Sequence, residues 1–104
     1  MPIVDLVEVR DRLGLGTAIP DETVTHLRDA VEAAILAVYP AIPSDLTAPA
    51  DAKEAVLQLC KDTWLAGRHS YDTDGAFTPQ ITSNTLQRYG ALLAAYRDVG
   101  TLAT

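Results

Sequence analysis

Apolar residues recur at intervals of three and four along the first part of the chain, which is the spacing of amphipathic helices. Near residues 5–14, Asp5 is suited to cap a helix and Gly14 to end it. Near residues 21–38, a longer stripe continues until Pro40, where the pattern ends. The apolar residues of the two stripes are Leu6, Val9, Leu13, Val24, Leu27, Val31, Ile35 and Val38. Two helices are therefore predicted before the proline.

Two more periodic segments follow a connector that is rich in turn-forming residues. The segment near 49–67 has an apolar arc wider than one buried stripe requires, so we expect it to be buried on two sides, either within the chain or against a second subunit. The segment near 83–99 has apolar residues three and four apart and stops near Gly100. Within the connector, we expect Ile42 and Leu46 to pack against the helices.

Length and composition favour a single all-α domain. The 104 residues suffice for one modest core, and the chain is 48% hydrophobic. Much of this apolar content is alanine, which favours helices in close contact. No internal repeat or change of composition divides the chain. The predicted fold is one helical domain over residues 1–104, a small bundle of about four helices with a long loop, residues 68–82, between the last two.

The predicted loop 68–82 is long for a small helical bundle, whose connections usually have about 2 to 8 residues. It contains Tyr71, Phe77 and Ile81, and large apolar side chains of this kind would serve no purpose in a solvated linker. We therefore expect an interaction loop that orders against another chain, because interfaces favour aromatic anchors. A flexible excursion from the bundle is the alternative.

Charge is negative overall and unevenly distributed. The net charge of −6 argues against a general nucleic-acid clamp, which needs a basic stripe to neutralise phosphates. Residues 1–82 hold six basic and thirteen acidic side chains, whereas residues 83–104 hold two basic and one acidic. Unlike faces suit head-to-side packing of identical copies into a ring, although solvated helix faces also vary in charge without consequence.

No residue pattern advertises a catalytic, cofactor or metal site. Asp72 and Asp74 suggest a calcium loop, but Ile81 stands where such a loop needs a bidentate glutamate, so an ordinary turn is expected. His26 is expected at the surface, and Cys60, the single cysteine, in an inert core position. We expect that the protein is not an enzyme and that it binds neither a cofactor nor a metal ion.

The sequence also lacks the marks of a membrane or secreted protein. It has no run of the roughly 20 apolar residues that a membrane span needs, and its first residues lack the basic start and apolar run of a signal peptide. No internal disulfide can form with one cysteine. A soluble protein made in the cytosol is expected.

Several stretches of the chain resemble the head-to-tail adaptor proteins of long-tailed phages, especially those of actinobacterial hosts. The resemblance extends over nearly the whole chain, and an Asp-Gly loop separates two of the stretches that carry it. The stretches are DRLG (11–14), PDE (20–22), AKEAVLQLC (52–60), WLAGR (64–68), LQRY (86–89) and AYR (95–97). The resemblance implies a small helical structural protein of the virion.

An adaptor of this class assembles as a ring beneath the portal after DNA packaging and provides the docking site for a stopper or tail protein. The resemblance implies a dodecamer in the virion, located at the head–tail interface, or neck, and present in the host cytoplasm during assembly. DNA would pass through the channel without sequence-specific binding, and an acidic lining would keep it from sticking. No membrane takes part.

Seven residues form the candidate protein interface in this interpretation: Trp64, Arg68, Tyr71, Phe77, Ile81, Arg88 and Arg97. Trp64 could instead be a core residue, or it could combine with Arg68 one turn later in a cation and ring contact. The rival hypothesis is a small acidic helical regulatory or antitoxin-like binding module, which would form a dimer and not a large ring.

Overall fold

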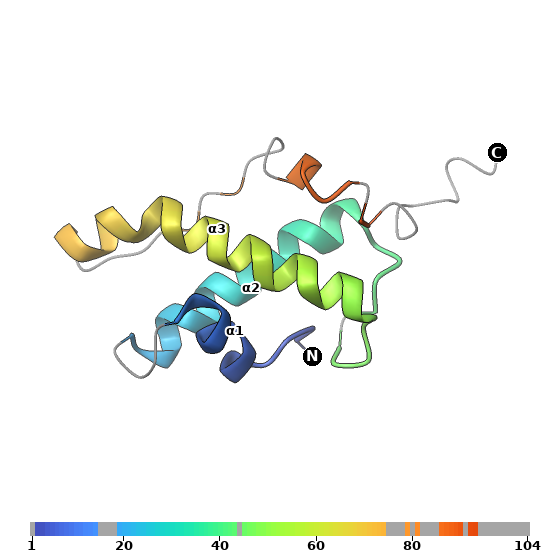
Figure 1. The fold of residues 1–104 in the computed structure, drawn as a ribbon, viewed down its shortest axis with the longest axis horizontal. Coiled ribbons are helices and arrows are strands. Elements are labelled where there is room, and N and C mark those ends of the chain that lie inside the picture. Colours follow the sequence, from blue (N-terminus) through green and yellow to red (C-terminus); the bar gives the residue numbers. More distant parts are fainter. Residues whose placement is uncertain are drawn as a thin grey trace.

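A computed structural model describes residues 2–14, 19–43, 45–74, 79, 81, 86–90 and 92–93 of the chain, and for 68–74 it describes the backbone alone. Within these residues the fold is all-helical, with three α-helices and no strands. The helices are α1 (Leu6–Leu13), α2 (Asp21–Val38) and α3 (Ala50–Asp74). In Figure 1, α3 crosses α2, and α1 lies beside α2, below α3 in this view.

Helix α1 begins and ends as the sequence predicts. Asp5 precedes it in an extended conformation, and the backbone N–H of Asp5 donates to Oε1 of Glu8 at 3.3 Å. Gly14 follows it with a φ of 69°, and its N–H donates to the carbonyl of Arg10 at 2.8 Å. A left-handed residue at this position favours glycine, because a Cβ would strain the turn.

Helix α2 matches its predicted bounds, since it begins after Pro20 and ends before Tyr39. Its predicted stripe is buried except at one end, where Val38 is exposed; the buried members are Val24, Leu27, Val31 and Ile35. Arg10 of α1 fixes the connection between the two helices, because it donates to the carbonyl of Ile19 at 2.7 Å and pairs with Asp21.

Helix α3 is longer than the sequence predicted, and the expected loop 68–82 is wrong for residues 68–74, which are helical. The same finding replaces the expected turn at Asp72 and Asp74 with helix. An interior glycine costs a helix only about 1 kcal/mol relative to alanine, and no proline occurs between Ala50 and Pro79. Gly67 lacks the positive φ that would end the helix there, so the helix continues.

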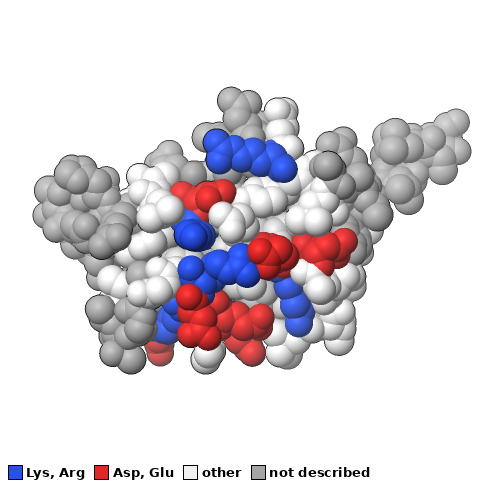
Figure 2. Space-filling model, in the orientation of Figure 1, with Lys and Arg blue, Asp and Glu red and all other residues white. Residues whose placement is uncertain are grey.

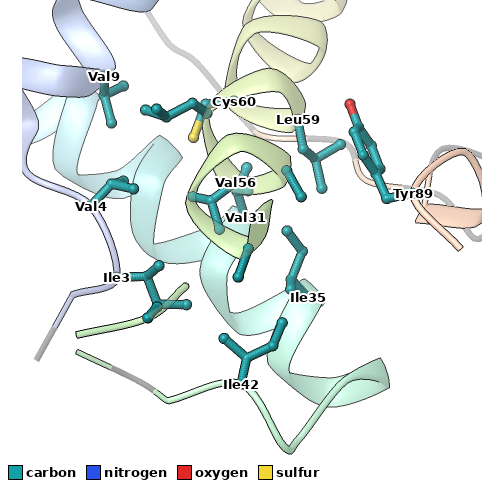
Figure 3. Packing of buried hydrophobic residues seen from close by; sticks show 14 of the residues in the cluster. Ile3, Val4, Val9, Val31, Ile35, Ile42, Val56, Leu59, Cys60 and Tyr89 are labelled. Atoms are coloured by element: carbon teal, nitrogen blue, oxygen red, sulfur yellow. The ribbon is translucent and has the colours of Figure 1, made fainter. Parts of the chain in front are cut away.

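The broad apolar arc of α3 is buried within the chain. At 100° per residue its buried positions cover roughly 200° of the helix circumference: Ala52, Ala55, Val56, Leu57, Leu59, Cys60, Thr63 and Trp64. Both α1 and α2 pack against α3, and buried Tyr89 and Leu93 belong to the same apolar cluster. Figure 3 shows Tyr89 on the side of α3 that carries Leu59.

Polar bonds fix α3 on both flanks of this arc. On one flank, Arg12 of α1 forms two parallel hydrogen bonds with Glu54, each 2.7 Å long. On the other, the Tyr89 hydroxyl donates to Oδ2 of Asp62 at 2.8 Å, and the side-chain amide of Gln58 donates to Oδ1 of Asp62 at 3.2 Å. The segment around Tyr89 is thereby joined to the middle of α3.

The predicted fourth helix near 83–99 is not confirmed. Residues 86–90 form a helical turn in which the N–H of Tyr89 donates to the carbonyl of Leu86 at 3.1 Å. Apart from this turn and residues 92–93, the segment lies outside the described residues. In the connector, Ile42 is buried as expected, but the expectation for Leu46 is wrong because its side chain is 40% exposed.

No helix in the described part of the chain has the length and apolar character needed to cross a membrane.

Replacing Tyr89 with phenylalanine should lower the free energy of unfolding by about 0.5–1.5 kcal/mol, because the ring stays buried while its hydrogen bond to Asp62 is lost. Urea denaturation measures the change. Leu92→Ala is the matched control on the same segment, since this side chain is exposed and should contribute less than about 0.5 kcal/mol. Equal effects of the two substitutions would contradict the role of the Tyr89 bond.

Candidate interaction surface

Two of the predicted interface residues are covered by the chain itself. The Trp64 side chain is only 4% exposed and belongs to the apolar core, which is the alternative stated for it above. Ile81 is partly buried and packs against the same core. Neither residue therefore presents a large free apolar surface in this conformation.

The structure describes the other predicted interface residues only in part. Arg88 is exposed. Arg68 and Tyr71 lie on the helical backbone of α3, not on a loop, and their side chains are outside the description. Phe77 and Arg97 lie outside the described residues. The structure thus brings Trp64, Arg68 and Tyr71 onto one element, which the loop prediction did not anticipate.

The last turns of α3 run past the ends of α1 and α2 in Figure 1. Burial along the helix agrees with this arrangement. Ala55, Leu59 and Ala66 lie on one helical stripe, because they are separated by four and then seven positions. Ala55 and Leu59 are buried, whereas Ala66 is exposed. Leu65 beside it is 56% exposed. We call residues 65–74 the projecting end of α3.

Helical periodicity places Arg68 and Tyr71 four and seven positions after Trp64, on one stripe of α3. The stripe is buried where it passes the other helices, at Leu57, Cys60 and Trp64. Beyond Trp64 it continues into the projecting end. The projecting end therefore extends a core stripe away from the elements that cover its first part.

The remaining large exposed apolar side chains are scattered over separate elements. Val7 lies on α1, Val38 at the end of α2, Leu46 in the connector and Leu92 near the buried Leu93. Isolated exposed apolar residues are normal on a soluble domain and indicate no site. Leu65 differs from them because it stands at the start of the projecting end.

Acidic and basic side chains are mixed on the face shown in Figure 2. Three arginines are held in ion pairs with acidic side chains: Arg10 with Asp21, Arg12 with Glu54 and Arg28 with Asp29. The first two pairs join different helices, whereas the third is between neighbours on α2. The exposed pairs contribute little to stability individually, but they neutralise much of the basic charge of α1 and α2.

A buried carboxylate is the polar feature that the sequence interpretation missed. Glu32 of α2 is only 7% exposed, and its Oε2 accepts hydrogen bonds from the backbone N–H of Ile3 at 2.9 Å and of Val4 at 3.2 Å. Burial raises the pKa of Glu32, while the two backbone bonds and nearby Arg28 oppose the rise. The available signal was its position beside Val31 in the most apolar half of α2.

Two further residues with polar groups, Cys60 and Thr63, are buried on α3. The Cys60 thiol is fully buried, and burial, assisted by the charge of Glu32, raises its pKa to about 12. It is therefore an inert core cysteine, as predicted. The hydroxyl of Thr63 is buried without a hydrogen-bond partner among the described residues. His26 is exposed on α2, also as predicted.

Within the described residues, no group of three or more His, Cys, Asp or Glu side chains could hold a metal ion. No protein-family model, curated protein or solved structure matches the chain.

Cys60 should resist thiol reagents in the folded protein. A pKa of about 12 in place of the ordinary 9.0 lowers the thiolate fraction at neutral pH by about a thousandfold, and the thiolate is the reactive form. Labelling with a thiol-reactive disulfide should be slow in buffer and fast in concentrated urea. Rapid labelling in buffer under native conditions would contradict the core placement of Cys60.

Proposed function

We propose that this chain is a structural, non-enzymatic subunit: a head-to-tail adaptor of a long-tailed phage, which forms a ring beneath the portal after DNA packaging. It would provide the docking site for a stopper or tail protein and occupy the neck of the virion. The sequence resemblance suggests this role. The projecting end of α3 is the structural observation that carries it.

The projecting end is suited to contact a neighbouring subunit or the portal. An exposed leucine on a helix end that leaves its own bundle is available for a contact with another molecule. Its sequence also contains Arg68 and Tyr71, which belong to the residue types that are enriched at the centres of protein interfaces. The interaction surface is thus assigned to the end of α3 and to the residues that follow it, in place of a loop alone.

The acidic character of the chain fits a channel through which DNA moves. A net charge of −6 in each subunit would repel the phosphate backbone when many copies surround it. The ion pairs of Arg10, Arg12 and Arg28 leave less free basic charge for DNA to bind. Sequence-specific DNA binding is not part of this proposal.

The purified chain, mixed with the portal protein of its own phage, should form a ring on the portal that is visible by negative-stain electron microscopy and measurable by native mass spectrometry. Isolated copies can remain monomeric, because assembly can require the portal as a template. A chain that stays monomeric with the portal would overturn the proposal. A stable dimer that ignores the portal would favour the regulatory or antitoxin-like module.

Leu65→Glu should abolish or strongly weaken the ring, because it places a charge in the buried contact of the projecting end. Val38→Glu is the matched control, since Val38 is also an exposed apolar residue on a helix but lies at the end of α2. Both variants should unfold at the same urea concentration as the unmodified chain. Equal assembly by the two variants would remove the projecting end from the interface.

A further inference from the structure

Residues 2–5 cover part of the core without belonging to a helix or strand. The side chains of Ile3 and Val4 in this segment, which we call the strap, are fully buried. Figure 3 shows them on the side of α2 and α3 that carries Val31, Val56 and Cys60. The strap therefore closes one edge of the seam between these two helices.

Glu32 is the polar anchor of the strap. Two consecutive backbone N–H groups, those of Ile3 and Val4, donate to the same oxygen, Oε2 of Glu32. Such bonds form with either the ionised or the protonated carboxyl group, because a protonated carboxyl keeps an acceptor oxygen. The strap can thus stay closed over a neutral Glu32 without losing its hydrogen bonds.

An ionised Glu32 is poorly compensated in the closed state. Among the described residues, the charged or titratable groups that act on it are Arg28 and Asp29 of α2, with Cys60 on the facing α3. Arg28 is itself paired with Asp29 at 3.2 Å, and the Cys60 thiol, whose pKa burial raises to about 12, brings no positive charge. Water would solvate the Glu32 carboxylate better than these groups do, and the closed strap separates the carboxylate from the solvent.

We propose that the strap is a proton-sensitive cover: it closes over the α2–α3 seam while Glu32 is protonated and opens more often once Glu32 is ionised. Opening gives the carboxylate access to water and uncovers the seam beside Cys60. The rest of the bundle is expected to keep most of its packing, because α1, α2 and α3 also contact one another directly.

The direction follows from proton linkage. Burial raises the pKa of Glu32 in the closed state above its ordinary value of 4.5, whereas an opened, solvated Glu32 returns toward that value. The closed strap thus binds the proton more tightly, so its advantage is complete below the open-state pKa and declines as pH rises through the closed-state pKa. Each unit by which the closed-state pKa is raised makes opening about tenfold more frequent at high pH.

Amide hydrogen exchange in the full chain, followed by NMR from about pH 4 to 8, tests this mechanism. The protection factors of the Ile3 and Val4 amides, corrected for intrinsic exchange, should fall as pH rises, whereas protection in the buried middle of α2 should change less. In Glu32→Gln, which keeps an acceptor oxygen but cannot ionise, the protection of both amides should stay level.

Two results in the unmodified chain would overturn the proposal, and one in Glu32→Gln would do so as well. One is a level protection profile for Ile3 and Val4 in the unmodified chain, which is informative even if Glu32→Gln does not fold. The other is a parallel loss of protection throughout α2 and α3, because the whole domain would then open and the strap would not act alone. An identical decline in Glu32→Gln would assign the pH dependence to another group.

Discussion

The burial of α3 is the constraint on which the rest of this fold depends. Its arc of small and large apolar residues is too broad for one partner helix, so several segments cover it, among them α1, α2 and the turn around Tyr89. Hydrophobic burial of this kind supplies most of the driving force for folding. The polar bonds at the flanks, from Arg12 to Glu54 and from Tyr89 to Asp62, then fix how the covering segments are oriented.

The same constraint changes where a partner can bind. A wide apolar arc on one helix could have indicated a second subunit, but most of this arc is satisfied within the chain, and Trp64 with it. On α3, the surface that the proposed function leaves for a partner is the part that lies beyond α1 and α2. In an adaptor ring built on this chain, the interface would thus be formed by the end of a core helix. The packing of that helix in the core would fix where the interface lies.

Sequence periodicity predicted the elements whose ends carry strong signals. Asp5 and Gly14 define α1, and Pro20 and Pro40 limit α2, because capping groups, left-handed glycine and proline act locally. The end of α3 was misplaced because Gly67 and the polar residues after it resemble a loop in composition. A helix already nucleated and packed over five turns continues through one glycine, and composition does not record that cooperativity.

Buried polar chemistry was harder to anticipate. Glu32 lies in a stretch whose periodicity is clear, but a carboxylate beside an apolar stripe is usually a solvated residue at its edge. Its hydrogen-bond partners are backbone N–H groups of the strap, nearly thirty residues away in the sequence. Contacts of this range are set by tertiary packing, and short-range patterns contain no trace of them.

Gly67 gives the projecting end of α3 a particular property. Seven residues follow it in the helix, which is too few for a helix to persist on its own, because isolated helices shorter than about 12–15 residues are marginal in water. Those turns exist as a continuation of the packed part of α3, and a glycine is the point where that continuation is weakest. A binding partner could lengthen or unwind them with little effect on the domain, so one subunit could fit neighbours whose spacing differs.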